Sequence, residues 1–341
     1  MRLSALGLGC WAFGGGDYWG PQSQADVNAV CRAAVDAGVN YFDTAEAYND
    51  GRSETSLGEA LAGLPRDKLV IGTKISPSNA APKILVEHCE ASLKRLRTDY
   101  VDLYMIHWPI APHSIRHFNS APEAVNHPAR VEDAAAALLA LQSQGKVRHI
   151  GVSNFGVARV REIQQAGVSV AANELMYSLL ARAIEWDILP FCRANGVGVV
   201  AYMPLMQGLL TGKYRALADV PPMQRRTRHF NAKVPGTLCR HGEEGAEAEA
   251  QQALDTIRRL AGENGATMAD LAVSWALAGQ GVTSVIVGCR NTGQLRENLR
   301  SAAYSLDTAL ALALSEATEA LKQALGPSFD YYENPRDDRT R

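Results

Sequence analysis

The fold is indicated most clearly by residues 68–107, which read KLVIGTKISPSNAAPKILVEHCEASLKRLRTDYVDLYMIH. The two ends of this segment, 68–74 and 100–107, are mostly apolar runs with β-branched residues, which is typical of parallel strands covered on both faces. The longer stretch between them, 81–97, has a helical pattern. A strand, a helix and a second strand in this order predict a parallel pair joined by a right-handed crossover.

The same unit repeats along the chain. The expected strands are 3–10, 39–43, 68–74, 100–107, 147–153, 168–174, 197–202 and 282–288. The expected helices are 24–38, 54–63, 81–97, 131–145, 156–167, 183–196, 247–262, 267–279 and 291–303. Eight strand–helix units close most naturally into a (β/α)8 TIM barrel, an α/β fold, although counting alone leaves an open doubly wound sheet as the alternative. We expect this barrel as a single domain over 1–325, followed by a C-terminal tail, 326–341.

The composition is that of an ordinary globular chain. Hydrophobic residues make up 47% of the 341 residues and charged residues 21%, which suits a sizeable core. The formal net charge of −2 argues against a nucleic-acid-binding protein, which relies on a broad basic surface. No apolar run of membrane-spanning length exists, and the six cysteines have no paired spacing. We therefore expect a cytoplasmic protein without a membrane or nucleic-acid partner.

Two connections between the expected elements are unusually long. Residues 108–130 are rich in proline and histidine, and residues 203–246 are rich in arginine. Loops of this length are usually lids, binding loops or disordered segments, and a tolerated surface insertion is the alternative. The basic composition of the second loop favours an anionic ligand. The tail, with its aromatic and charged residues, either folds over the barrel mouth or frays.

Charged or hydrogen-bonding residues recur where the expected strands end. In chain order they are Asp43, Lys74, His107, Ser153, Asn154, Glu174 and Tyr202, with Gly288 and Arg290 just past the eighth strand. Any one of them has a simpler explanation as a helix cap or a solvated strand end. Together they predict a functional site at the carboxyl face of a barrel, where such enzymes build their active sites.

Tyr48 follows the strand end at Asp43 by five residues. The ordinary pKa of a tyrosine is about 10, so a catalytic proton donor needs a neighbour that favours its phenolate. Lys74 at the next strand end can supply that ammonium, and Asp43 can hold Lys74 in place. His107 can orient a carbonyl or relay a proton. The set predicts an acid that protonates the alkoxide formed in carbonyl reduction, although a tyrosine so placed is more often only a packing residue.

A reduction needs a hydride donor, and residues 286–298, IVGCRNTGQLREN, are suited to a phosphate-bearing cofactor. The segment reads as a strand, a glycine turn and a helix start, where backbone N–H groups attract phosphate. Arg290 adds a positive charge, and Asn291, Gln294 and Asn298 share one face of the helix. A capping box formed by Asn291 and Gln294 is the alternative explanation for two of these residues.

Two other motifs also have a competing structural explanation. Ser153 and Asn154 precede a helix, so N-capping competes with ligand binding there. Residues 7–12, GLGCWA, match the dinucleotide fingerprint GxGxxA, but no helical pattern begins before about residue 22. The fingerprint requires the helix to start within the motif, so this match is interpreted as accidental.

Aromatic residues follow several of the expected strands. Tyr202 can stack on a flat heterocycle or pack in the core. Trp11, Trp19 and Trp108 follow strand ends and would form an apolar, aromatic wall for a substrate, although buried tryptophans are common without any ligand.

In this order and spacing, these residues resemble the aldo-keto reductase superfamily. The resemblance runs through LGLGCWAFGG, YFDTAEAY, VIGTK, DLYMIHW, RHIGVSNF, VVAYMPL, GLLTGKY and VGCRNTGQLREN, and covers nearly the whole chain. It is closest to bacterial members with a long loop after the seventh strand. The family implies an (α/β)8 barrel that binds NADP(H) in extended form, without a Rossmann unit.

The resemblance also implies roles for the matching residues. Tyr48 is expected as the general acid/base, with Asp43 and Lys74 tuning it and His107 orienting the carbonyl. The expected cofactor ligands are Ser153, Asn154 and Glu174 at the nicotinamide carboxamide, Tyr202 stacked on the ring, Leu205, Gly208 and Lys213 at the pyrophosphate, and Gly288, Arg290, Gln294 and Asn298 at the adenosine and 2′-phosphate. The expected substrate-binding residues are Trp11 and Trp108. No metal site is expected.

The chain departs from the family pattern at three positions. Glu174 stands where glutamine is usual, so it can accept a hydrogen bond from the carboxamide but is not expected to donate one. We hypothesise that its charge favours the cationic, oxidised nicotinamide. Met203 replaces a small hydroxyl residue, which removes one phosphate contact, and Val287 replaces a proline.

The sequence therefore predicts an NADP(H)-dependent oxidoreductase that interconverts an aldehyde or ketone with an alcohol, with NAD(H) the less favoured cofactor. Small-molecule carbonyls derived from sugars or polyols are among the candidate substrates. The alternative from another class is a regulatory or interaction protein that binds NADP(H) on the same fold with little turnover.

Overall fold

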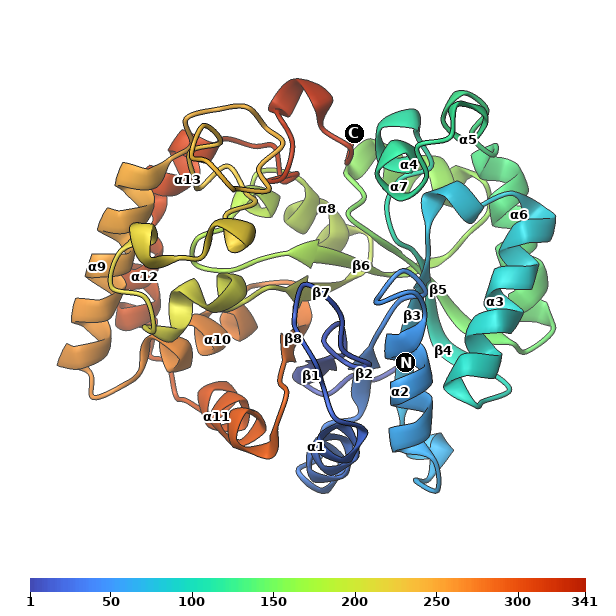
Figure 1. The fold of residues 1–341 in the computed structure, drawn as a ribbon, viewed down its shortest axis with the longest axis horizontal. Coiled ribbons are helices and arrows are strands. Elements are labelled where there is room, and N and C mark those ends of the chain that lie inside the picture. Colours follow the sequence, from blue (N-terminus) through green and yellow to red (C-terminus); the bar gives the residue numbers. More distant parts are fainter.

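The eight strands form a closed parallel barrel in the computed structural model, which describes all 341 residues (Figure 1). They are β1 Leu6–Gly9, β2 Tyr41–Asp43, β3 Val70–Ile75, β4 Val101–Ile106, β5 Val147–Ser153, β6 Val170–Met176, β7 Gly198–Tyr202 and β8 Val282–Gly288. Each strand pairs in parallel with the next, and β8 closes the sheet on β1. The predicted barrel is confirmed, and the open doubly wound sheet is excluded.

The helices surround the barrel, as Figure 1 shows. They are α1 Gln24–Asp36, α2 Arg52–Leu61, α3 Pro82–Leu96, α4 Pro112–Phe118, α5 Pro122–Asn126, α6 Val131–Ser143, α7 Val157–Gln165, α8 Ile188–Ala194, α9 Glu247–Glu263, α10 Met268–Ala278, α11 Thr292–Ala302, α12 Thr308–Ala317 and α13 Glu319–Leu325. The sequence did not predict α12 and α13, nor the short helices α4 and α5 within 108–130. No helix is expected or found in the GLGCWA motif.

One predicted helix is shorter than expected. The pattern over 183–196 becomes a 3₁₀ turn, Ala183–Glu185, followed by α8, which begins at Ile188. Pro190 is the reason, because proline lacks the N–H that an earlier turn would need and its ring clashes with the carbonyl four residues before it. Proline is tolerated only in the first turn of a helix, so α8 begins close to it.

Alternate strand residues fill the interior of the barrel. The inner cluster consists of Tyr41, Val70, Leu103, Met105, Ala172, Val200 and Ile286. Tyr41 occupies space that two glycines leave open: a Cβ on Gly7 would lie 2.7 Å from its ring, and a Cβ on Gly72 would lie 2.8 Å from its hydroxyl. The barrel is therefore packed by side chains, and its hydrogen-bonding chemistry is confined to the rim.

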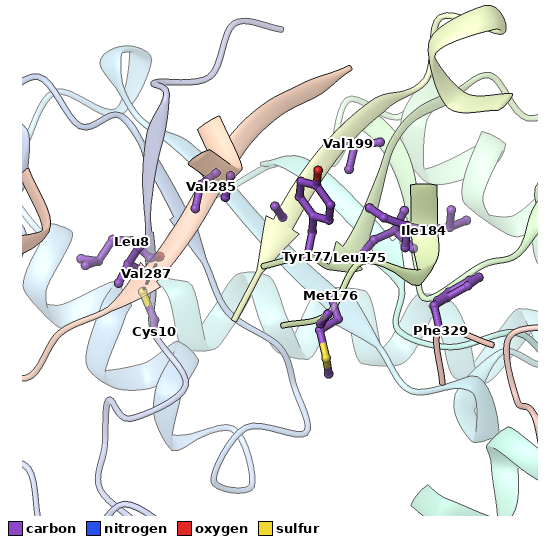
Figure 2. Packing of buried hydrophobic residues seen from close by; sticks show 14 of the residues in the cluster. Leu8, Cys10, Leu175, Met176, Tyr177, Ile184, Val199, Val285, Val287 and Phe329 are labelled. Atoms are coloured by element: carbon purple, nitrogen blue, oxygen red, sulfur yellow. Dashed lines mark hydrogen bonds between the residues drawn. The ribbon is translucent and has the colours of Figure 1, made fainter. Parts of the chain in front are cut away.

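The opposite faces of the strands pack against the helices in a second, larger core. Leu8 of β1 lies level with Val287 of β8 in this layer, and Figure 2 shows both beside Cys10. Phe329 of the C-terminal tail belongs to the same cluster and is visible in Figure 2. The tail is thus packed into the protein.

The tail returns to the loops around the mouth of the barrel. The backbone carbonyl of Thr340 accepts a hydrogen bond from Gly156 N at 2.8 Å, and the carbonyl of Arg339 accepts one from Ser114 Oγ at 3.2 Å. Tyr331, which is buried, accepts a backbone hydrogen bond from Arg228 in the long loop 203–246. Of the two alternatives for the tail, the structure has the folded one. None of the helices combines the length and the apolar character that crossing a bilayer requires.

Candidate active site

The register of the barrel explains why residues far apart in the chain meet at one rim. Side chains two positions apart on a strand point to the same face, so an inward-facing residue is followed two positions later by another. These pairs are Tyr41–Asp43, Gly72–Lys74, Met105–His107, Gly151–Ser153, Ala172–Glu174 and Val200–Tyr202. The second member of each pair lies within two residues of the carboxyl end of its strand, so all six surround the same opening.

Lys74 lies at the centre of this opening. Its Nζ is 2.7 Å from both carboxylate oxygens of Asp43 and donates to the Thr44 carbonyl at 3.0 Å. The same Nζ is 3.4 Å from the Tyr48 hydroxyl and 3.3 Å from Glu174 Oε1. Burial alone lowers the pKa of Lys74, but the two carboxylates outweigh it and raise the pKa above its usual value. Lys74 is therefore a fixed cation.

Tyr48 enters the site from the loop that follows β2. Its ring centroid lies 5.5 Å from the ring of His107 and 5.8 Å from that of Trp11. Burial raises the pKa of Tyr48 above its ordinary value; Lys74 opposes this, and Asp43 adds to it. The expectation that Lys74 brings this pKa towards neutrality is wrong, because burial and the carboxylates outweigh the ammonium. Tyr48 is held as the protonated phenol beside a cation.

His107 is buried next to Tyr48, with the two rings at 76° to each other. Burial lowers the pKa of His107 well below its ordinary value, and the charge of Lys74 lowers it further. The imidazole is therefore neutral, with one nitrogen that donates and one that accepts. Its Nδ1 is buried without a partner. A neutral imidazole can orient an oxygen atom by a hydrogen bond without carrying charge.

Glu174 is the second carboxyl group of the site. Its side chain is buried, Oε1 faces Lys74, and Oε2 has no hydrogen-bond partner. Burial raises the pKa of Glu174 well above its ordinary value, the nearby charge of Asp43 adds to this, and Lys74 opposes it. Asp43 keeps the closer contact with the single ammonium, which favours the protonated form of Glu174 over its carboxylate. A protonated carboxyl group can donate a hydrogen bond as well as accept one.

A chain of hydrogen bonds joins the ends of β5, β6 and β7. Ser153 Oγ donates to the Glu174 carbonyl at 3.1 Å, Asn154 Nδ2 donates to Ser153 Oγ at 3.0 Å, and the Tyr202 hydroxyl donates to Asn154 Oδ1 at 2.8 Å. The N-cap of α7 is Gly156, with no side-chain cap. N-capping therefore does not explain Ser153 and Asn154, whose side chains face the opening.

Comparison with known proteins gives this arrangement a family. The model of the Aldo/keto reductase family matches residues 5–318. The NADH-specific methylglyoxal reductase of Escherichia coli K12 is 33% identical over 95% of this chain and 97% of its own length. The L-glyceraldehyde 3-phosphate reductase of the same strain is 30% identical, over 88% of this chain and 84% of its own. The chain belongs to the aldo/keto reductase family.

The aldo/keto reductase fold is also found by structure. An aldo/keto reductase from Klebsiella pneumoniae, solved in complex with NADP and acetate, aligns with a TM-score of 0.67 at 26% identity. The alignment covers 99% of this chain and 94% of that one. Sequence and structure together establish the chain as an oxidoreductase that acts between carbonyl compounds and alcohols.

In this aldo/keto reductase, the segment after β7 has an unusual backbone. Met206, Gln207 and Gly208 have successive φ angles of 46°, 54° and 96°, all in the left-handed region. A Cβ on Gly208 would come within 2.6 Å of Lys213 Nζ, and the φ of 96° at this position favours glycine. Strained backbone of this kind concentrates at functional sites, and successive turn-like N–H groups form concavities that attract anions. Leu205 precedes the strained run.

The residues after β8 are brought together as predicted, but they are already engaged. The Arg290 guanidinium donates to Gln22 Oε1 at 2.8 Å and to the Trp19 carbonyl at 2.7 Å, and also contacts the Pro21 carbonyl. Gln294 Oε1 accepts from Arg290 N at 2.8 Å. Arg290 therefore ties the β1 loop to the start of α11.

The expected capping box at this helix is half formed. Asn291 is the N-cap and accepts from Gln294 N at 2.9 Å, but Gln294 accepts from Arg290 and not from Asn291. Asn298 is buried and its Nδ2 lies 3.4 Å from the Gly288 carbonyl. Capping thus explains Asn291, and leaves the side chains of Gln294 and Asn298 beside the glycine turn.

The aromatic residues form a wall on one side of the mouth. Trp11 is stacked on Tyr18, with ring centroids 5.2 Å apart, and lies edge-on to Trp19 at 5.3 Å. Trp108 has a different neighbour. The guanidinium carbon of Arg339, in the tail, lies 3.8 Å from the centroid of the Trp108 ring. Trp11 faces Tyr48 directly, whereas one face of Trp108 is already occupied by the tail.

Several residues at the mouth were not predicted from the sequence. They are Tyr18 in the β1 loop, Phe118 of α4, Arg226 in the long loop, and Tyr332 and Arg339 in the tail. Phe118 lies 5.5 Å from the ring of His107, and Arg226 lies between the rings of Tyr18 and Tyr332. The only signal in the sequence was the mixture of aromatic and basic residues in these segments, which does not specify which of them meet.

Proposed function

We propose that this aldo/keto reductase interconverts an aldehyde or ketone with the corresponding alcohol, using a nicotinamide dinucleotide and Tyr48 as general acid/base. The observation that supports this most directly is the Tyr48 hydroxyl 3.4 Å from Lys74 Nζ, with His107 beside it. A bound nicotinamide would supply the hydride, and the protein would supply the proton and the field around the oxygen.

The three polar residues act on the oxygen of the substrate. Tyr48 is protonated because its pKa is raised, so it is ready to donate to an alkoxide. Lys74 stays charged and lies next to the phenolate that remains after the donation, which stabilises it. His107 is neutral and can donate a hydrogen bond to the same oxygen without competing as a cation. Asp43 keeps Lys74 in place.

The residues around the opening fit a nicotinamide cofactor. Glu174 Oε2 is buried without a partner, and the N–H of a carboxamide would satisfy it. Ser153 and Asn154 lie beside it on the same hydrogen-bonded chain, and the Tyr202 ring ends β7 at the opening. The strained run Met206–Gly208, preceded by Leu205, and Lys213 suit a pyrophosphate, because the backbone N–H groups and the ammonium both attract an anion.

We further propose that NADP(H) is preferred over NAD(H). Arg290 has five N–H donors, of which its contacts with the β1 loop use three, so two remain for a 2′-phosphate. Gln294 and Asn298 lie beside it at the glycine turn of Gly288. The Klebsiella pneumoniae enzyme binds NADP, whereas the Escherichia coli methylglyoxal reductase is NADH-specific. The ratio of kcat/KM for NADPH and NADH tests this preference directly.

The proposed substrate is a small carbonyl compound. The relatives named above act on methylglyoxal and L-glyceraldehyde 3-phosphate, which are short aldehydes with further oxygen atoms. Sugar- and polyol-derived carbonyls share this chemistry. Trp11 supplies an aromatic surface beside Tyr48 for the carbon skeleton of such a compound.

The experiment that tests the proposal replaces Tyr48 with phenylalanine. Loss of a positioned general acid typically lowers the rate about 10²–10⁴-fold, so the Tyr48→Phe variant should lose nearly all turnover of a short aldehyde. Cofactor binding should be retained, since the hydroxyl acts on the substrate oxygen. Turnover is followed by nicotinamide absorbance and cofactor binding by calorimetry.

The same experiment separates an enzyme from a regulatory NADP(H)-binding protein. If the wild-type protein binds the cofactor but reduces no aldehyde in a broad panel, the regulatory alternative is correct. If Tyr48→Phe keeps substantial turnover of a good substrate, the assignment of Tyr48 is wrong while the enzyme remains.

A further inference from the structure

We propose that Arg226 is the centre of an oxyanion-binding site at the mouth of the barrel, which favours carbonyl substrates that carry a carboxylate or phosphate group. This inference rests on the proposed function, because it names the class of substrate for the same site. Three observations support it: the position of the Arg226 guanidinium, the buried donors without acceptors around it, and the row of aromatic rings that connects Arg226 to Tyr48.

Arg226 differs from the other half-buried or buried arginines of its loop in having no ion pair and no backbone carbonyl as an acceptor. Its guanidinium carbon lies 5.3 Å from the ring centroids of both Tyr18 and Tyr332, and it has no ion pair and no acceptor other than the Tyr18 hydroxyl beside it. Its neighbours Arg225 and Arg228 use their guanidinium groups on backbone carbonyls. A half-buried guanidinium held between two rings, with most of its donors free, is suited to bidentate binding of a carboxylate or phosphate.

Other donors near Arg226 also lack acceptors. Tyr18 OH, Trp19 Nε1 and Gln207 Nε2 are all buried without a hydrogen-bond partner. The rings of Tyr18 and Trp19 are 4.9 Å apart, and both Arg226 and Gln207 act on the Tyr18 hydroxyl, lowering a pKa that burial raises. Buried donors in native proteins are almost always paired. What these groups have in common is the need for an acceptor, which an oxyanion would supply.

Two arginines near Arg226 are neutralised by carboxylates, and Arg226 is not. Arg240 pairs with Glu333 at 2.6 Å and Arg339 pairs with Asp330 at 2.7 Å, whereas Arg226 has no carboxylate partner. Burial lowers the pKa of His117 to about 4, and the charges of the three arginines lower it further. An anion entering this region therefore meets an uncompensated positive charge.

A continuous aromatic wall leads from Arg226 to the catalytic tyrosine. Tyr18 packs on Arg226, Trp11 is stacked on Tyr18 at 5.2 Å, and Trp11 lies 5.8 Å from Tyr48. A substrate whose carbonyl contacts Tyr48 can lie along this wall with its anionic end at Arg226. The cofactor pyrophosphate is the second source of an oxyanion, because Gln207 belongs to the strained segment after β7.

The test compares charged and neutral substrates of similar size. Glyceraldehyde 3-phosphate is compared with glyceraldehyde, and succinic semialdehyde with butyraldehyde, at saturating cofactor. In the Arg226→Gln variant, kcat/KM for the anionic member of each pair should fall by about tenfold or more, as expected for a lost charged hydrogen bond, while the neutral member changes little. The cofactor dissociation constant is measured in parallel. Arg215→Gln is the matched control, because Arg215 is exposed in the same loop and has the same charge.

The outcomes separate the sources of the anion. A loss confined to anionic substrates supports the proposal as stated. An equal loss for both members together with weaker cofactor binding assigns Arg226 to the cofactor and overturns the substrate class. An equal loss with unchanged cofactor binding shows a purely structural contact, and no loss beyond that of Arg215→Gln shows no anion site; both overturn the proposal.

A direct binding measurement keeps the inference independent of turnover. If wild-type protein reduces no carbonyl at all, the proposed function fails, and binding of inorganic phosphate is then measured by calorimetry. Phosphate that binds wild type and Arg215→Gln equally, but binds Arg226→Gln about tenfold more weakly, still supports an oxyanion site. Phosphate that binds all three proteins alike overturns it.

Discussion

The site has two halves that are built in different ways. The rim, which consists of Asp43, Lys74, His107 and Glu174, lies at strand ends, and Lys74 contacts Asp43 at 2.7 Å and Glu174 at 3.3 Å. The roof consists of Tyr18, Arg226, Tyr332 and Arg339 and comes from two loops and the tail. Its contacts are mainly rings against guanidinium groups, at 5.3 Å for Arg226.

In the proposed function, the rim carries the chemistry and the roof carries the selectivity. Strand ends are fixed by the hydrogen-bonded register of the barrel, so they can hold a proton donor and a cation in exact relation to each other. Loops are joined by weaker contacts and tolerate change, so they can set the substrate without disturbing the reaction. The predictions that follow contrast the two halves, and begin with the largest effect.

Removing the cation of the rim should have the largest effect on stability. In Lys74→Met, the buried carboxyl groups of Asp43 and Glu174 lose their counter-ion, which costs about 3–5 kcal/mol at neutral pH. Protonation removes the uncompensated negative charge, so the loss should be smallest at acid pH and grow as the pH rises. Urea denaturation at several pH values measures it. Lys68→Met, at an exposed lysine, is the control, and a loss that does not depend on pH would contradict the explanation.

In the roof, breaking the ion pair between Asp330 and Arg339 should disturb the C-terminal tail and leave the rest of the fold in place. Asp330 binds the Arg339 guanidinium with both oxygens, at 2.7 and 2.8 Å, and both side chains are buried. Asp330→Asn leaves that guanidinium only the more distant carboxylate of Glu333, 3.9 Å away, which costs about 3 kcal/mol and should release the tail from Trp108. Limited proteolysis and tryptophan fluorescence detect the release. Glu333→Gln, at a less buried partner, should leave the tail protected, and an equally protected tail in Asp330→Asn would refute the local model.

The smallest expected effect concerns the proton on Glu174. An oxidised nicotinamide is cationic and favours the ionised carboxylate, so its binding should release this proton. In the wild type, the ratio of the affinity for the oxidised cofactor to the affinity for the reduced cofactor should therefore rise with pH. The rise can be up to about tenfold per pH unit, which is the limit when one proton is released. In Glu174→Gln the ratio should be flat. Dissociation constants of both cofactor forms across pH give the answer, and parallel curves for the two proteins would rule out a role for Glu174.

The barrel and most of the rim could be predicted from the sequence because both depend on local pattern. Mostly apolar segments such as 147–153 and 282–288 became strands at those same residues. The alternation of side chains then placed Lys74 and Asp43 together, although they are 31 residues apart. The protonation state was predicted less well. The pKa of Tyr48 is raised, whereas the sequence predicted that it would be lowered. The reasons are the burial of Tyr48 and the number of carboxyl groups that share Lys74.

The roof could not be predicted, since no local pattern specifies how loops meet. Arg226, Tyr18 and Tyr332 lie in three separate segments and come together only in the folded chain. Arg290 shows the same limit, because its position after β8 was foreseen but its contacts with the β1 loop were not.

The sequence by itself determined the eight strand–helix units and the chemical groups at the strand ends, because side-chain alternation repeats every two residues and needs no information from elsewhere, while the structure decided that the strands close into a barrel. Only the tertiary structure decided which charges are paired, which proton is retained and which arginine is left free. Those properties depend on burial and on the distances between segments far apart in the chain, and neither is encoded in any single stretch of residues.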